Sequence, residues 1–152
     1  MSLSQQVAAA LAAPDGYSSA LRLIVDHFRA DTGTIHILES DGILHLKAAS
    51  GGIPEVVLER VRLVPIGKGM AGLAAERAEP VTVCNLQTDT SGNAKPGAKA
   101  TGMEGAIVVP IFRGEAVAGT LGIANRAERT FTSEETDLLI EVGRAIAAAK
   151  AG

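Results

Sequence analysis

Residues 105–125 read GAIVVPIFRGEAVAGTLGIAN, and this stretch decides the fold. Two apolar runs flank Arg113-Gly114-Glu115, and a glycine between β-rich runs predicts a hairpin turn because it adopts positive φ without steric cost. For a turn of two or four residues, large residues of the first strand would lie beside small residues of the second. One face would hold Ile107, Val109 and Ile111 with Ala116, Ala118, Thr120 and Gly122, and the other Ala106, Val108 and Pro110 with Val117, Gly119, Leu121 and Ile123.

Both faces of this predicted hairpin are apolar. An antiparallel hairpin with one face in water should alternate apolar with polar residues, and this one does not. We therefore expect the rest of the chain to cover both sides of the sheet, and one of the two covers is a candidate ligand site.

Length and composition exclude several classes of function. A chain of 152 residues is expected to form a single domain, residues 1–152. A net charge of −3 and an aromatic content of 3% argue against nucleic acid as a partner. No apolar run approaches the roughly 20 residues that span a bilayer, and no signal peptide is visible. The single cysteine forbids an internal disulfide, so a cytoplasmic protein without a membrane partner is expected.

Helices are predicted at both ends of the chain. Residues 4–13 form a short Ala-rich helix, and a stronger one begins with Asp15 as N-cap and is stopped by Gly33. A last amphipathic helix starts at Thr132, which forms a capping box with Glu135.

A second hairpin is predicted around Asp41-Gly42, the strongest short-range turn signal in the chain. A two-residue loop there pairs Ile37 with Leu46 and Ile35 with Ala48. The reverse face is mixed, and it is either exposed to solvent or the polar wall of a cavity. It holds Thr34, His36, Leu38, His45 and Lys47.

The middle of the chain alternates short elements with glycine-rich turns. We expect a helical turn at 54–60, strands at 61–66 and 80–86, and a helix at 71–77 that Gly72 allows to pack closely. The run Gly67-Lys68-Gly69 lacks the Walker spacing and so does not predict a nucleotide triphosphate site. Residues 87–101 are polar and long for a loop, which favours a functional lid over one sheet face.

Three phrases together resemble a GAF domain: IGKGMAGLAAERAEPVTVCNLQTD, GAIVVPIFRGEAVAGTLGIANR and FTSEETDLL. The resemblance covers residues 15–148. It implies an α+β, PAS-like fold: a central antiparallel sheet of about six strands, terminal helices on one face, and loops with short helices over the other. It also implies a small-molecule pocket under the second cover, a sensory or regulatory role, and homodimers formed through the terminal helices.

The activities known for such domains find partial support. The cyclic-nucleotide signature is matched in part, by Asn125, Arg126, Phe131, Glu134 and Glu135. The sulfoxide reductases of this family need a nucleophilic and a resolving cysteine, and Cys84 is alone. Bilin attachment requires a reactive cysteine, whereas Cys84 sits in an apolar strand and is expected to be buried and inert.

A metal or haem site would need histidine ligands. His36 and His45 fall on one face of the predicted hairpin, but no third ligand at useful spacing completes a site. No metal is therefore expected, and no cofactor is identified.

We predict a non-catalytic sensory domain, with no enzymatic activity, that binds an unidentified small molecule. The candidate ligand-binding residues are His36, Cys84, Asn85, Met103, Ile107 and Val109. The alternative is a structural dimerisation module whose pocket is filled by side chains. Cyclic-nucleotide binding and thiol-based redox sensing through Cys84 are weaker possibilities.

Overall fold

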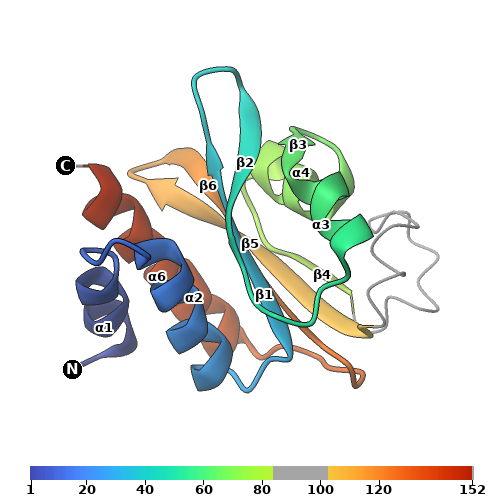
Figure 1. The fold of residues 1–152 in the computed structure, drawn as a ribbon, viewed down its shortest axis with the longest axis horizontal. Coiled ribbons are helices and arrows are strands. Elements are labelled where there is room, and N and C mark those ends of the chain that lie inside the picture. Colours follow the sequence, from blue (N-terminus) through green and yellow to red (C-terminus); the bar gives the residue numbers. More distant parts are fainter. Residues whose placement is uncertain (84–102, 152) are drawn as a thin grey trace.

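The computed structural model describes residues 1–83 and 103–151. This part of the chain forms five helices and six strands (Figure 1). The helices are α1 (Leu3–Ala10), α2 (Gly16–His27), α3 (Glu55–Val61), α4 (Gly69–Arg77) and α6 (Ser133–Ala151). The strands are β1 (Thr32–Leu38), β2 (Ile43–Ala49), β3 (Leu63–Pro65), β4 (Val81–Val83), β5 (Gly105–Arg113) and β6 (Ala116–Asn125).

The strands form one antiparallel sheet in the order β3-β2-β1-β6-β5-β4. The terminal helices α1, α2 and α6 cover one face, and the short helices α3 and α4 lie over the other (Figure 1). This arrangement confirms the predicted α+β class and the predicted division of the covers. The predicted loop at 87–101 lies outside the described residues.

The register of the β5–β6 hairpin differs from the prediction. Near the turn Arg113 lies opposite Ala116 and Phe112 opposite Val117, as a two-residue turn requires. A β-bulge between Ile111 and Phe112 then shifts every later pair by one residue, and a one-residue shift moves side chains to the opposite face. Ile107 consequently lies opposite Ile123, and Val109 opposite Leu121.

Large and small residues are therefore sorted by face, and the predicted mixture of the two is wrong. The large side chains of β5 and β6 pack under the terminal helices. With residues of α1, α2 and α6 they form the main core cluster, which includes Val7, Leu21, Ile24, Ile107, Val109, Ile111, Leu121, Leu139, Val142 and Ile146. The opposite face keeps the smaller residues, among them Ala106, Gly122 and Ala124.

The β1–β2 hairpin has a three-residue loop, Ser40 to Gly42, in place of the predicted two-residue loop. The Glu39 amide donates to the Ile43 carbonyl across its base, and Gly42 has a φ of 78°. A bulge then restores the predicted pair of Ile35 with Ala48, whereas Ile37 lies opposite His45 instead of Leu46.

Both ends of the chain show the expected helix signals in part. The capping box is confirmed: the Thr132 amide donates to Glu135 Oε1 and the Glu135 amide to Thr132 Oγ1, both at 3.0 Å. Asp15 is the N-cap of α2 but makes no side-chain capping bond. Gly33 does not end α2, because the helix stops at His27 and Gly33 lies inside β1.

Across the described residues, none of the helices has the length and apolar character needed to cross a membrane.

Candidate functional site

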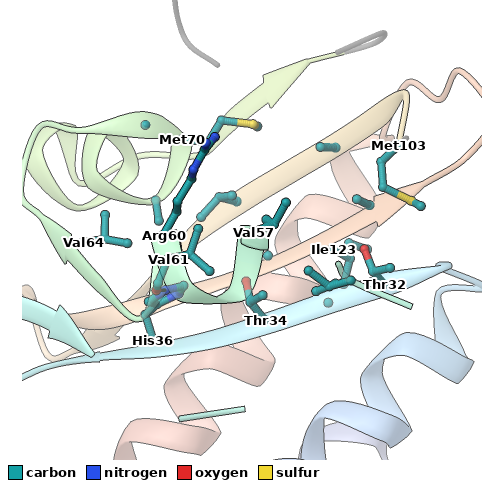
Figure 2. A pocket seen from close by; sticks show the side chains of 18 of the residues that line it. Thr32, Thr34, His36, Val57, Arg60, Val61, Val64, Met70, Met103 and Ile123 are labelled. Carbon is teal, nitrogen blue, oxygen red and sulfur yellow. Dashed lines mark hydrogen bonds between the residues drawn. The ribbon is translucent and has the colours of Figure 1, made fainter. Parts of the chain in front are cut away.

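A cavity of about 570 Å³ lies between the sheet, including its edge strand β3, and the cover formed by α3 and α4. A volume of this size is typical of sites for small organic ligands. Figure 2 shows Thr32, Thr34 and His36 of β1 along one side of it, with Val57, Arg60 and Val61 of α3 and Met70 of α4 on the other.

The floor of the cavity is open because its central residues are small. Gly122 of β6 lies opposite Val108 of β5 and Thr34 of β1, with Ala106 and Ala124 close by on the same face. A Cβ placed on Gly122 would lie 3.2 Å from Val108 Cγ2 and 3.3 Å from Thr34 Oγ1. Because Gly122 has no side chain, Val108 and Thr34 fit beside it and the cavity above it stays open.

Another glycine, Gly72, allows the cover to lie close to the edge strand β3. A Cβ on Gly72 of α4 would collide with the carbonyl oxygen of Pro65, the last residue of β3. The prediction that Gly72 allows close packing of this helix is confirmed.

His36 joins the floor to the cover. Its side chain is only 3% exposed, and Nε2 lies 2.8 Å from the carbonyl oxygen of Val61 at the end of α3. Because a carbonyl only accepts, Nε2 carries the proton and donates. Burial lowers the pKa of His36, so the ring is neutral and Nδ1 is an acceptor, for which the described residues supply no hydrogen-bond partner.

The lining also carries two cationic side chains, Arg60 near the end of α3 and Lys68 directly before α4. Among the described residues that line the cavity, none is acidic. The remaining walls are mostly aliphatic, with Met70 and Met103 at two sides (Figure 2).

The structure brings together three of the six predicted site residues. His36, Met103 and Ile107 line the cavity, although the side chain of Ile107 belongs to the main core cluster. Val109 does not, because it lies on the face of β5 that packs under the terminal helices, where it is fully buried. Cys84 and Asn85 lie outside the described residues.

The mixed face predicted for the β1–β2 hairpin is split by the observed register. Thr34 and His36 line the cavity. His45 Nε2 instead lies 2.8 Å from Asp41 in a surface hydrogen bond, and Lys47 lies 2.6 Å from Glu39 in a surface ion pair. His36 and His45 are consequently on opposite faces, and the described residues contain no group of three side chains that could hold a metal ion.

Sequence reasoning missed Thr32, Arg60, Lys68 and Met70. The alternation of Thr32, Thr34 and His36 along β1 was a usable signal, because alternate residues of a strand share a face. For Arg60 and Lys68 there was no such signal, since their place depends on how α3 and α4 lie over the sheet.

The partial cyclic-nucleotide signature has a structural role at a different place. Arg129, which the predicted signature did not include, contacts Glu135 at 2.5 Å and donates to Asn125 Oδ1 at 2.6 Å. Its guanidinium also lies over the ring of Phe131. These contacts join the end of β6 to the start of α6, and none of the residues of the predicted signature lines the cavity.

Comparison with known proteins shows which proteins share this architecture. A family model described as a GAF domain matches residues 16–149. The GAF domain of a phosphoenolpyruvate-protein phosphotransferase from Acinetobacter has a TM-score of 0.78 at 18% identity, covering 98% of this chain and 90% of that one. A free methionine-R-sulfoxide reductase from Neisseria meningitidis, solved in complex with its substrate, has a TM-score of 0.76 at 16% identity, covering 97% and 85%.

A domain from Sinorhizobium meliloti, described as part of a two-component sensor histidine kinase protein, has a TM-score of 0.70 at 18% identity, covering 88% of this chain and 86% of that one. The comparison with curated proteins found no match. At these identities the structural likeness shows the fold alone.

These neighbours correct the prediction that the chain is not an enzyme. Besides the protein from N. meningitidis, reductases of the same class from Staphylococcus aureus and Thermoplasma acidophilum share the fold over 97% of this chain. The prediction is wrong, because enzymes also have this fold and the domain type therefore does not argue against catalysis. The family model, which spans residues 16–149 of the chain, shows that it belongs to the GAF-domain family.

Proposed function

We propose that this GAF domain is a sensory or regulatory domain that binds a small molecule between its sheet and the α3–α4 cover. The observation that carries the proposal is the cavity of about 570 Å³, with the buried His36 in its wall. Two neighbours support the proposal by analogy: one is described as part of a sensor histidine kinase protein, and another was solved with its substrate.

The alternative, a dimerisation module whose pocket is filled by side chains, fits the structure less well. The small residues of the floor leave the space open instead of filling it. Homodimerisation through the terminal helices is compatible with ligand binding, and it remains a prediction that the sedimentation velocity of the purified chain would test.

Val108→Phe tests the proposal by filling the cavity. Val108 lines the cavity from β5, so a phenylalanine there adds a ring to the space that a ligand would occupy. Ligands that bind the folded state raise the melting temperature by mass action. We expect a library of nucleotides, organic acids and amino acids to contain compounds that stabilise the original chain and fail to stabilise Val108→Phe.

The matched control is Val56→Phe, since Val56 lies on α3, is 57% exposed and does not line the cavity. This variant should keep every thermal shift of the original chain. If the stabilising compounds act equally on Val108→Phe, they bind elsewhere and the proposed site is wrong.

A further inference from the structure

We infer that the cavity selects an organic anion, a molecule with one acidic group on an apolar body. The inference rests on the binding function proposed above and names the class of ligand. It is argued from the charge of the lining, the first turn of α4 and the state of His36.

The charge balance of the cavity is one-sided. Arg60 and Lys68 both line it, and no acidic residue does so among the described ones. Neither cation takes part in an ion pair between described residues, whereas the nearby Arg62 contacts Glu59 at 3.3 Å. Figure 2 shows the Arg60 side chain extending in the direction of Met70, along the cavity wall. Both residues are exposed, so water already solvates their charges, and a ligand with a negative group would form charge-assisted hydrogen bonds with them there.

The first turn of α4 adds to the positive electrostatic potential of the cavity. The helix has nine residues, and Gly69, Met70 and Ala71 at its start line the cavity. Its N-cap is Lys68, which makes no side-chain capping bond because its ammonium group has no hydrogen-bond acceptor. The amide groups at a helix N-terminus attract anions, so the positive end of α4 and the two cationic side chains favour the same kind of ligand group.

His36 marks the part of the cavity that does not take the acidic group. Its Nε2 proton is committed to Val61 and its Nδ1 is fully buried, so His36 offers no hydrogen-bond donor to an anion. The walls beside it are apolar, and Val57 and Val61 are among them (Figure 2). We therefore place the acidic group at the α4 end and the apolar body along the sheet.

The one-sided charge also separates ligand classes. An amine or a free amino acid carries an ammonium group, which buries favourably only beside an acidic partner. The described lining offers cations in that position instead. A carboxylate and a phosphate monoester share the chemistry that the cavity favours.

The test compares ligands that share one apolar body and differ in the end group. The first set is 3-phenylpropanoate, 3-phenylpropyl phosphate, 3-phenylpropanamide, 3-phenylpropylamine and phenylalanine, and the second set repeats these end groups on butyl and hexyl chains. Dissociation constants are measured by calorimetry on the full chain at pH 7.5. We expect at least one acid to bind about tenfold more tightly than its amide, which corresponds to about 1.4 kcal/mol.

Variants then assign the selectivity to residues. Arg60→Gln and Lys68→Gln should each weaken acid binding by about threefold to tenfold, because each removes one charge-assisted contact at a solvent-accessible site. Both should leave amide binding unchanged. Arg62→Gln is the matched control, since Arg62 follows α3 directly and does not line the cavity, and it should bind acids like the original chain.

The outcomes separate the two proposals. If amides, amines or amino acids bind as tightly as the acids of the same body, or if no acid of either set binds better than its amide, the anion class is overturned. The binding function would still stand if neutral compounds stabilise the original chain and not Val108→Phe. A preference for phosphate over carboxylate, or the reverse, supports the class and identifies the acidic group.

Discussion

His36 lies where the floor of the cavity meets its cover. It is a residue of β1 by sequence, but its hydrogen bond to Val61 ties the sheet to the end of α3. Losing a buried donor leaves the Val61 carbonyl without its partner, which costs about 1–3 kcal/mol. The residue therefore affects both the position of the cover and the stability of the fold.

We predict that His36 makes the stability of the domain depend on pH just below neutrality. Burial lowers the pKa of His36 below its ordinary value of 6.5, so the unfolded chain takes up a proton there before the folded chain does. Stability from the neutral ring is fully present above pH 6.5 and is lost as the pH falls from 6.5 toward the folded pKa. Urea unfolding between pH 5 and 7.5 should show the free energy of unfolding fall with the pH.

The variant His36→Gln checks this assignment. Glutamine keeps an N–H donor for Val61 and does not titrate, so the fall in stability between pH 6.5 and 5 should flatten. His45→Gln, on the surface beside Asp41, is the control and should retain the fall. An unchanged slope in His36→Gln would show that another group causes it.

At the scale of elements, strands β6 and β1 approach each other closely at Gly119. Gly119 of β6 lies opposite Ile37, and a Cβ on Gly119 would collide with the His36 carbonyl oxygen. We predict that Gly119→Ala pushes the two strands apart and lowers the free energy of unfolding by about 1–3 kcal/mol, the range of overpacked cores. Gly51→Ala is the control, because nothing lies within 4 Å of a Cβ at Gly51, and it should change stability by less than about 0.5 kcal/mol. Equal effects in urea titrations would contradict the prediction.

The elements were predictable from sequence where a local signal identifies them. The capping box of Thr132 and Glu135 and the turn at Gly114 depend on neighbouring residues, and both appear as expected. Register was not predictable in β5 and β6, because both strands are apolar on both faces and either alignment buries them. The bulge beside Ile111 selects the observed alignment. The only sequence signal for it was that this alignment, unlike the regular one, places large residues on one face and small residues on the other.

Across the whole molecule, the sheet divides two tasks between its faces. The face under α1, α2 and α6 carries the main core, and the face under α3 and α4 carries the cavity. Half of the predicted site residues line the cavity because the family resemblance pointed to the correct sheet region. Val109 was misplaced and Arg60 and Lys68 were missed, because tertiary packing decides which elements cover each face of the sheet.

This division predicts that two adjacent valines contribute unequally to the free energy of unfolding. Val109→Ala removes buried methyl groups from the main core and should cost about 2 kcal/mol of stability. Val108→Ala only enlarges a cavity that is already open, and it should cost less than half as much. Urea unfolding of both variants measures the difference, and equal losses would show that the cavity side supports the fold as strongly as the core side.

The sheet ends at β3, a strand of only three residues whose last residue is Pro65. Strands exposed at the edge of a sheet are templates for pairing with another chain, and short, proline-bearing edges resist it. A second molecule that approached this side would find too few backbone groups to extend the sheet. The β3 border therefore offers little backbone for pairing with another chain, although the central strands are apolar on both faces.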